Sequence, residues 1–182
     1  MLDLATGTGD LAFLASARGA SVVGLDITLQ MLELAAAKRT GAAPTFVRAD
    51  MLELPFPDDS FDVITTGYGI RNVPDLGRAL DEIARVARPH GRFVSLDFDR
   101  PANPVIRGLY LGYLTLVGSM LGLLLHGDPD TYRYIPASLR QYPGSEQVAQ
   151  MLRARGFRQT DVIPVLGGLM AIHRACKIGT KD

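Results

Sequence analysis

Short apolar runs alternate along the chain with stretches in which apolar residues recur every three or four positions. Such runs are typical of buried strands, and the wider spacing is typical of helices that pack on one face. Strands are predicted over 1–5, 21–25, 45–48, 61–66 and 91–98, and helices over 10–18, 29–38 and 76–88. This alternation predicts an α/β fold with a doubly wound, Rossmann-like and mostly parallel sheet.

The pattern changes after residue 98. Residues 101–144 contain several prolines and an uncharged apolar run from Gly108 to Leu125. Connections of this length usually carry function, so we interpret 101–144 as an insertion on the substrate side of a single domain covering 1–182. A membrane span needs about 20 predominantly apolar residues, and this run almost reaches that length. Because Gly, Tyr, Thr and Ser interrupt it, a buried or interfacial helix is preferred to a span.

The last part of the chain returns to regular elements. A helix is predicted over 145–155, followed by strands near 157–165 and 169–178. The pair Gly167-Gly168 between these strands is typical of a hairpin turn. We therefore expect an antiparallel strand at the carboxyl-terminal end of the sheet.

Composition narrows the classes of function. The 182 residues suit one domain, and 19 Lys and Arg balance 19 Asp and Glu, so no overall basic charge indicates a nucleic-acid partner. Cys176 is the single cysteine, and the three histidines show no ligand spacing, so we expect no metal site. No basic, apolar leader precedes the first strand. The chain is therefore expected to be cytoplasmic, with peripheral membrane contact as an alternative.

A glycine turn follows the first predicted strand directly, in the segment Thr6-Gly7-Thr8-Gly9. Glycines here let the backbone approach a ligand closely. The same residues fit a dinucleotide fingerprint, so a nicotinamide-dependent oxidoreductase is one alternative. However, Asp3 lies just before the turn, where its charge would repel a pyrophosphate and attract a cation.

Two further acids follow the next two predicted strands. Asp26 ends the second strand at the spacing of a carboxylate that accepts both hydroxyls of a ribose. Asp50 follows the third strand and precedes Met51, so this pair is placed to bracket an adenine. Together with Asp3 they indicate a positively charged nucleoside. The alternative is that each acid only caps a helix or turn.

Six motifs carry a resemblance to a known family. They are LDLATGTGD at 2–10, LPFPD at 54–58, GIRNV at 69–73, LDFDRP at 96–101, YRYIP at 132–136 and LMAIHR at 169–174. With these motifs the chain resembles class I S-adenosylmethionine-dependent methyltransferases, and more narrowly the menaquinone and ubiquinone C-methyltransferase family. The sequence begins inside the first predicted strand, so we expect it to lack the family's amino-terminal helical region. An inactive truncated relative is therefore another alternative.

The resemblance implies S-adenosylmethionine as the cofactor, with S-adenosylhomocysteine as its product. Asp26 would bind the ribose, Asp50 and Met51 the adenine, and the loop around Thr8 the methionine part. Gly67 stands where relatives often have Ser. The implied cofactor-binding residues are Asp3, Thr6, Gly7, Thr8, Gly9, Asp26, Ile27, Asp50, Met51 and Gly67.

The resemblance also implies methylation of a ring carbon of a prenylated hydroquinone, with demethylmenaquinone favoured and another small molecule as the alternative. A phenolate is a far better carbon nucleophile than a phenol, so handling the hydroxyl proton is the main chemical task. Arg71 is predicted to stabilise the phenolate, and Asn72 to hold a water or the second oxygen. Asp97 is predicted as the base or as an anchor for Arg71. Alternatively, Arg71 caps a helix or pairs with Asp75.

Tyr132, Tyr134 and His173 are predicted on the substrate side. The two tyrosines also fit one face of a strand, and a lone histidine in a strand is often structural. The apolar run after Pro104 suits a polyprenyl tail, peripheral contact with a membrane, or a homodimer interface.

Overall fold

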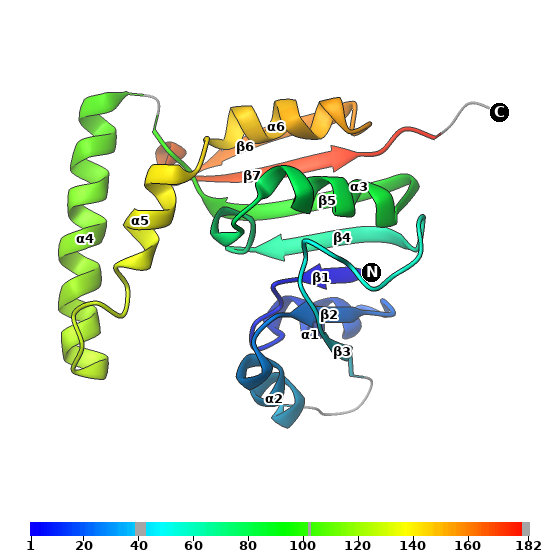
Figure 1. The fold of residues 1–182 in the computed structure, drawn as a ribbon, viewed down its shortest axis with the longest axis horizontal. Helices are drawn as coiled ribbons and strands as arrows, with labels where there is room; N and C mark the ends of the chain where they lie inside the picture. Colours follow the sequence, from blue (N-terminus) through cyan, green and yellow to red (C-terminus); the bar gives the residue numbers. More distant parts are fainter. Residues whose placement is uncertain (39–42, 102, 180–182) are drawn as a thin grey trace.

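The computed structural model describes residues 1–38, 43–101 and 103–179. Its centre is one sheet with the strand order β3-β2-β1-β4-β5-β7-β6 (Figure 1). The strands are β1 (Leu2–Leu4), β2 (Val23–Asp26), β3 (Thr45–Arg48), β4 (Phe61–Gly67), β5 (Ala87–Phe98), β6 (Gln159–Val165) and β7 (Met170–Cys176). The strands β1 to β5 are parallel, and β7 runs antiparallel to both β5 and β6. The predicted sheet and its antiparallel carboxyl-terminal strand are confirmed.

Helices follow most of the strands. They are α1 (Asp10–Ser16), α2 (Leu29–Ala37), α3 (Leu76–Val86), α4 (Pro104–His126), α5 (Tyr134–Gln141) and α6 (Ser145–Ala154), with single 3₁₀ turns η1 (Ile70–Asn72) and η2 (Leu166–Gly168). Helix α2 packs on β2 and β3, α3 on β5, and α6 on β6 and β7. Figure 1 shows α4 standing apart from the sheet, beyond the edge at which β4 and β5 end, with α5 between.

The core lies around the central strands. All three residues of β1 are buried, as expected for a strand covered on both faces of a parallel sheet. Leu2, Ile64 and Phe93, which lie on the neighbouring strands β1, β4 and β5, are fully buried. Leu80 of α3 packs in the same cluster. This packing holds the carboxyl ends of β1 and β4 in fixed positions.

Helix α3 ends earlier than predicted. The sequence pattern predicts a helix to residue 88, but Val86 is the last helical residue. Arg88 precedes Pro89, and the residue before a proline is disfavoured in helical conformation. Ala87 is already extended and pairs with Phe61, and a register shift in β4 follows.

The segment 101–144 is more regular than predicted. Besides the predicted apolar helix it contains α5, which was not predicted because its sequence is rich in proline. Pro136 lies in the first turn of α5, where a backbone N–H has no partner within the helix, so its absence does not destabilise the helix. Helix α4 begins with Pro104 after Asn103, whose side chain accepts hydrogen bonds from two backbone amides of the first turn. By length and composition α4 is able to cross a bilayer, yet only 11% of its most apolar window is buried. Of the two predicted alternatives, a buried or an interfacial helix, the buried one is therefore wrong.

Candidate active site

A cavity of about 400 Å³ lies at the carboxyl edge of the sheet, where β1, β2 and β4 end. Here the strand order changes direction, since β2 lies on one side of β1 and β4 on the other. Open α/β sheets bind ligands at such a point. The lining residues come from the strand ends and the loops after them: Ala5, Leu25, Asp26, Ile27, Thr28, Ala49, Asp50, Met51, Gly67, Tyr68, Gly69, Asn72, Val73 and Pro74.

The glycine loop connects β1 to α1 beside this cavity. Gly7 and Gly9 have φ angles of 55° and 81°, which residues with a side chain rarely adopt. A Cβ on Gly9 would lie 3.0 Å from atoms of both Phe13 and Phe46, whereas a Cβ on Gly7 would meet nothing within 4 Å. Gly9 therefore permits the packing of α1, and Gly7 leaves free space next to its backbone.

Asp3 holds this loop in place through hydrogen bonds. Its carboxylate accepts hydrogen bonds from the hydroxyls of Thr6 and Thr65, each at 2.6 Å. Burial raises the pKa of the Asp3 carboxyl, and the two hydroxyl donors oppose that rise. Asp3 and Thr6, which were both predicted to bind the cofactor, do not line the cavity. The strand β1 is covered on both faces, which leaves the Asp3 side chain buried.

Asp26, by contrast, lies at the cavity with both oxygens oriented. One oxygen accepts a hydrogen bond from the backbone N–H of Gly7 and the other from that of Thr28, both at 2.9 Å. A carboxylate oxygen has two lone pairs, so each can accept one further hydroxyl. The Asp26 side chain thus joins the glycine loop to β2 and keeps the acceptors that a ribose diol requires.

The remaining predicted cofactor residues divide between the cavity and its surroundings. Asp50 and Met51 line the cavity, and Asp50 also accepts a hydrogen bond at 2.9 Å from the backbone of Leu52, as a turn residue does. Thr8 donates instead to Asp10 at the exposed start of α1, outside the cavity lining. The structure therefore brings the second and third acids together, but not Thr8.

Residues directly after β4 contribute more to the cavity lining than the sequence indicated. Ile27 and Gly67 line the cavity, and so do Tyr68 and Gly69, which were not among the predicted site residues. The Tyr68 ring lies 5.4 Å from that of Phe98 at the end of β5. The position of Tyr68 directly after a predicted parallel strand was the signal that could have identified it.

A buried ion pair lies immediately behind Tyr68. Arg71 in η1 and Asp97 in β5 meet through Nη1 and Oδ1 at 2.5 Å, with both side chains 2% exposed. The backbone N–H groups of Arg71 and Phe98 also donate to this carboxylate. The Arg71 guanidinium donates to the Tyr68 carbonyl oxygen and lies 5.0 Å from the centre of the Phe98 ring. The predicted anchoring of Arg71 by Asp97 is confirmed.

The alternative partner of Arg71 is engaged elsewhere. Asp75 caps α3 by accepting a hydrogen bond at 2.9 Å from the backbone N–H of Arg78, so the alternative pair between Arg71 and Asp75 is wrong. Burial raises the pKa of the Asp97 carboxyl, and the Arg71 guanidinium opposes that rise. The Nε of Arg71 is buried without a hydrogen-bond partner in the described part of the chain, which leaves one strong donor unused.

Two buried tyrosines from the segment 101–144 interact electrostatically with this ion pair, and the sequence did not indicate either. Tyr110 of α4 donates to the Leu169 carbonyl oxygen at 3.0 Å, and burial raises its pKa to about 12. Tyr142, just after α5, is 3% exposed, and burial raises its pKa as well. Asp97 raises the pKa of Tyr142 further, and Arg71 opposes the rise in both tyrosines. Both phenols therefore remain protonated at neutral pH.

The tyrosines that were predicted on the substrate side lie differently. Tyr134 begins α5 and is 53% exposed, and Tyr132 lies in the turn before it. Tyr132 packs on α4, because a Cβ on Gly118 would lie 3.2 Å from its Cβ. The alternative that they share one face of a strand is wrong, since a helix forms here. Neither residue lines the 400 Å³ cavity.

His173 occupies a structural position in β7. Its Nε2 lies 2.8 Å from the carbonyl oxygen of Ser145, which can only accept, so Nε2 carries the proton. Its Nδ1 lies 2.9 Å from the Ser95 hydroxyl and accepts from it. Burial lowers the pKa of His173, which favours the neutral ring. With 1% exposure and both nitrogens engaged, His173 joins β5, β7 and α6. The structure thus gives it a buried structural position and not the predicted one on the substrate side.

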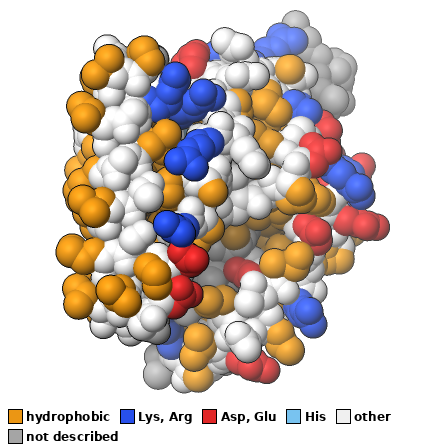
Figure 2. Space-filling view, turned by 60° about the vertical axis from the view of Figure 1, so that its left-hand side comes forward, with side chains coloured by type: hydrophobic (Ala, Val, Ile, Leu, Met, Phe, Trp, Pro, Cys, Tyr) orange, Lys and Arg blue, Asp and Glu red, His pale blue; other side chains and the backbone are white. Residues whose placement is uncertain are grey.

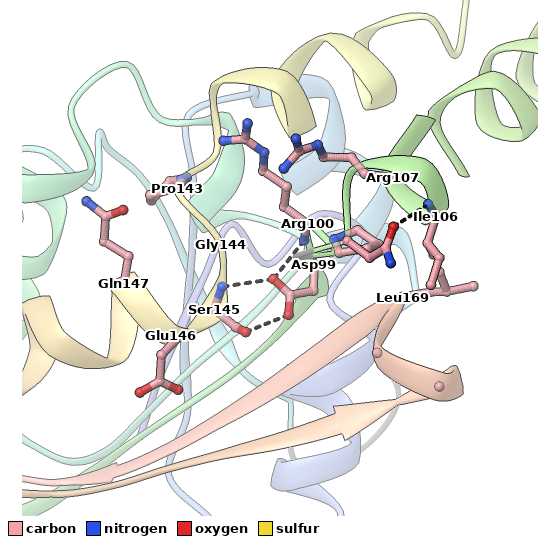
Figure 3. Close-up of a pocket in the computed structure, with 14 residues that line it drawn as sticks. Asp99, Arg100, Ile106, Arg107, Pro143, Gly144, Ser145, Glu146, Gln147 and Leu169 are labelled. Carbon is pink, nitrogen blue, oxygen red and sulfur yellow. Dashed lines mark hydrogen bonds between the residues drawn. The ribbon is translucent and has the colours of Figure 1, made fainter. Parts of the chain in front are cut away.

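A second cavity of about 560 Å³ lies where β5 ends, between the starts of α4 and α6 and the turn between β6 and β7. Asp99 forms one wall by accepting hydrogen bonds from the Ser145 backbone N–H at 2.8 Å and its hydroxyl at 2.5 Å (Figure 3). The guanidinium groups of Arg100 and Arg107 turn to the same side (Figure 3). This cavity is larger than the first but is separate from the glycine loop and Asp26, so the smaller cavity is the candidate cofactor site.

Comparison with known proteins agrees with this geometry. The model of the ubiE/COQ5 methyltransferase family matches residues 1–177. The demethylmenaquinone methyltransferase of Thermus thermophilus is 43% identical over 177 residues, which cover 95% of this chain and 80% of the relative. The ubiquinone/menaquinone biosynthesis C-methyltransferase UbiE of Brucella abortus is 39% identical over 184 residues, which cover 97% of this chain and 68% of the relative.

Solved structures with the same fold are more distant in sequence. A SAM-dependent methyltransferase from Aquifex aeolicus aligns with a TM-score of 0.67 and 20% identity, over 97% of this chain and 81% of the other. A Haemonchus contortus phosphoethanolamine N-methyltransferase, solved with S-adenosylhomocysteine, aligns with a TM-score of 0.70 and 17% identity, over 98% of this chain and 48% of the other. At these identities the likeness establishes the fold.

Proposed function

The chain belongs to the ubiE/COQ5 methyltransferase family, and from this premise we propose that it methylates a ring carbon of a prenylated hydroquinone, with demethylmenaquinone as the favoured substrate. It is a methyltransferase that uses S-adenosylmethionine, which excludes the nicotinamide-dependent alternative. The observation that supports the substrate class is the buried pair of Arg71 and Asp97 beside the cofactor cavity, because it holds a fixed cation near the position where an anionic oxygen would form.

The first cavity fits an adenosyl ligand. Its volume of about 400 Å³ lies within the range of small-molecule sites. Asp26 keeps two acceptors for a ribose, and the described residues that line the cavity include no Lys or Arg side chain that would favour a diphosphate. In this proposal Met51 and Ile27 pack against the adenine, Asp50 accepts from it, and the space beside Gly7 receives the methionine part.

When bound, the cofactor supplies an electrophilic methyl group on a positively charged sulfur. The chain must then hold the acceptor ring in line with that group, and much of the rate gain of an enclosed site comes from such positioning. The cavity wall formed by Tyr68 and Asn72 follows β4 and faces the cofactor side of the sheet. We assign the ring to this wall, next to η1.

Arg71 stabilises the phenolate in this arrangement. Arginine stays protonated at ordinary pH, so it acts through its charge and its donors and does not remove the proton itself. A buried donor without a partner costs about 1–3 kcal/mol. An oxygen anion that accepts from the unused Arg71 Nε would remove that cost and bring the charges together in a site that excludes water.

Asp97 and Asn72 position the groups around Arg71. Asp97 accepts three hydrogen bonds from Arg71 and Phe98 and forms an ion pair with Arg71, so it serves as an anchor and is a poor candidate for the base. The Asn72 amide donates to the Tyr68 carbonyl oxygen at 3.1 Å and lines the cavity. We assign Asn72 to a water or to the second ring oxygen.

The direct test is methyl transfer in vitro. The purified chain is incubated with S-adenosylmethionine that carries a deuterated methyl group and with reduced demethylmenaquinone, and the extracted quinone is analysed by mass spectrometry. We expect one labelled methyl group on the ring carbon. The oxidised quinone, which lacks a hydroxyl to ionise, should remain unlabelled.

A matched control uses menaquinol that is already methylated at the ring position. It should gain no label, because the acceptor carbon is occupied. Cofactor binding by calorimetry is measured in parallel. Tight binding of S-adenosylhomocysteine with no label on any ring carbon would contradict the quinone substrate and favour another small-molecule acceptor.

A further inference from the structure

Tyr68 has a backbone conformation that residues with a side chain rarely adopt. Its φ of 58° lies in the left-handed region, where glycine is favoured. Glycine occupies both neighbouring positions, Gly67 and Gly69, yet a large aromatic residue stands at the position that strains the backbone. Such outliers persist only where the surrounding structure imposes them, and they are concentrated at functional sites. The conformation of Tyr68 therefore directs attention to its side chain.

Hydrogen bonds hold the Tyr68 backbone on both sides of the peptide. Its N–H donates to the Leu96 carbonyl oxygen at 2.8 Å. Its carbonyl oxygen accepts from the Arg71 guanidinium and from the Asn72 amide, each at 3.1 Å. These contacts fix the direction in which the side chain leaves the backbone.

The Tyr68 ring is supported by an aromatic neighbour. Its centre lies 5.4 Å from that of the Phe98 ring, with the two planes tilted by 44°, which is within the range of favourable aromatic pairs. The Phe98 ring is held in turn by the Arg71 guanidinium, at 5.0 Å from its centre. Tyr68 nevertheless remains 44% exposed. The ring is thus oriented by its neighbours while a large part of the residue stays open.

Two other tyrosines in the described part of the chain are more exposed than Tyr68, but neither lines the cofactor cavity. Tyr113 is 60% exposed and lies on α4, whose apolar side chains form a column along one side of the molecule (Figure 2). Tyr134 is 53% exposed and begins α5. Tyr68 is the one aromatic residue among the described residues that line this cavity.

Tyr68 lies on the acceptor side of the cavity. Asp26 and Met51, which we assigned to the adenosine, lie at the end of β2 and after β3, whereas Tyr68 directly follows β4. In the sheet, β1 separates β2 from β4. The guanidinium of Arg71, to which we assigned the phenolate, is hydrogen-bonded to Tyr68 itself. The Tyr68 ring is therefore placed to meet the acceptor and not the adenine.

We propose that the acceptor ring stacks on the ring of Tyr68, and that Tyr68 determines the preference of this site for an aromatic acceptor. The inference rests on the proposed function, because it gives the hydroquinone ring its position. Methyl transfer to a ring carbon uses the π electrons of the ring, so the acceptor must present a face to the methyl group. Stacking covers one face, holds the ring in place and leaves the other face free to react. This role requires the ring of Tyr68 and not its hydroxyl.

The test compares variants of Tyr68 in steady-state methylation of reduced demethylmenaquinone. Tyr68→Leu and Tyr68→Gly both remove the ring and should raise the KM for the hydroquinone by about tenfold. Glycine also suits the left-handed backbone, so Tyr68→Gly remains informative even if leucine destabilises the fold. Tyr68→Phe keeps the ring and should restore the KM to within about threefold of the wild-type value. In all three variants the Kd for S-adenosylhomocysteine should stay within about twofold.

The matched control is Tyr113→Leu, which removes an exposed tyrosine ring that does not line the cavity. It should retain the wild-type KM. Calorimetry with the methylated naphthohydroquinone ring, without a prenyl tail and in the presence of S-adenosylhomocysteine, measures acceptor binding without turnover. Tyr68→Leu should bind this probe about tenfold more weakly, and Tyr113→Leu should bind it like the wild type. Circular dichroism and thermal unfolding verify that each variant is folded.

The results separate this inference from the proposed function. Methylation by the wild type with an unchanged KM in Tyr68→Leu and Tyr68→Gly would overturn the stacking role and leave the proposed function intact. A parallel rise in the Kd for S-adenosylhomocysteine would also overturn it, since Tyr68 would then shape the cofactor site. An equal rise of the KM in Tyr68→Phe would assign the effect to the hydroxyl. A wild type that binds S-adenosylhomocysteine but methylates no hydroquinone would refute the proposed function, and the stacking role with it.

Discussion

The leucines of the sheet region and those of α4 are used in opposite ways. Leu2 and Leu4 of β1 and Leu80 of α3 have no exposed surface, whereas Leu116 and Leu124 of α4 are 73% and 72% exposed. The first group forms the internal core that positions the cofactor cavity. The second contributes little to that core, and nothing in the described part of the chain covers it. The same residue type therefore forms the core in one region and lies at the surface in the other.

Truncation of one leucine from each region tests this comparison most strongly. Leu80→Ala removes a fully buried side chain and should lower the free energy of unfolding by about 2–5 kcal/mol. Leu116→Ala should change it by less than about 0.5 kcal/mol. Urea unfolding followed by circular dichroism measures both. A large loss for Leu116→Ala would mean that α4 is part of the core, and the comparison would fail.

The cofactor side depends on Asp26. Asp26→Ala removes the acceptor for the Gly7 and Thr28 amides as well as the proposed ribose contact. Hydrogen bonds to a charged group contribute about 1.5–3 kcal/mol each, so the Kd for S-adenosylhomocysteine should rise at least 100-fold. Isothermal titration calorimetry measures the affinity.

The control for this change is Asp161→Asn, since that carboxylate pairs with Arg174 on the exposed edge of the sheet. It should bind the cofactor product with wild-type affinity. Asp26→Asn should lie between the two, because an amide keeps one acceptor oxygen and loses the charge. Unchanged affinity in Asp26→Ala would rule out this residue as the ribose ligand.

The two regions meet at η1, which contains Arg71 and contacts α5. Arg71→Lys keeps a positive charge but loses the planar donor set that Asp97 and the Phe98 ring hold. We expect kcat for hydroquinone methylation to fall by about 30-fold to 100-fold, as when a preorganised donor to an oxyanion is removed, with cofactor affinity within twofold. Steady-state kinetics and calorimetry separate the two effects.

Arg78→Lys is the corresponding control on the exposed surface of α3, and it should retain the wild-type kcat. A parallel fall of cofactor affinity and kcat in Arg71→Lys would indicate that the ion pair shapes the cavity as a whole. That result would contradict a specific role for Arg71 at the reacting oxygen.

The extent to which the sequence predicted these features differs between the same two regions. The strand over 45–48 has the predicted bounds, and the position of Asp26 at the end of its strand follows from short-range pattern alone. The pair of Arg71 and Asp97 could be predicted because Arg71 follows β4 and Asp97 lies at the end of the neighbouring parallel strand β5. Local patterns decide such features, since the sheet places successive strand ends at one edge.

The features that the sequence did not predict depend on how α4 and α5 pack on the rest of the molecule. Tyr142 is buried at the end of α5, which packs on both α4 and η1, and no local signal in the sequence specifies that arrangement. Tyr132 and Tyr134 were chosen in its place because they belong to a recognisable motif. The sequence also did not predict the exposure of α4, because an apolar helix has a similar composition in a protein core, at a lipid surface and in a protein interface.

The smallest expected effect concerns the pH dependence of stability. It tests the contact between β7 and the start of α6, where the two regions meet. His173 holds Ser145 at the start of α6, next to the end of the segment 101–144. Burial lowers its pKa below the ordinary value of 6.5, so the unfolded chain binds a proton at a higher pH than the native chain does. Stability is therefore lost as the pH falls below about 6.5, by at most about 1.4 kcal/mol per pH unit for this one proton.

The variant His173→Asn should be less stable at neutral pH but should lose less stability between pH 7.5 and pH 5.5 than the wild type. His90→Asn is the control, because His90 is exposed and its φ of 63° suits asparagine. Burial raises the pKa values of Asp3 and Asp97, and their opposite contribution is common to all three proteins, so it cancels in the difference. Thermal melts across the pH series measure the slopes. If His173→Asn and the wild type lose stability in parallel, the ring does not titrate on unfolding, and the join between β7 and α6 is held by Asp99 and Ser145 instead.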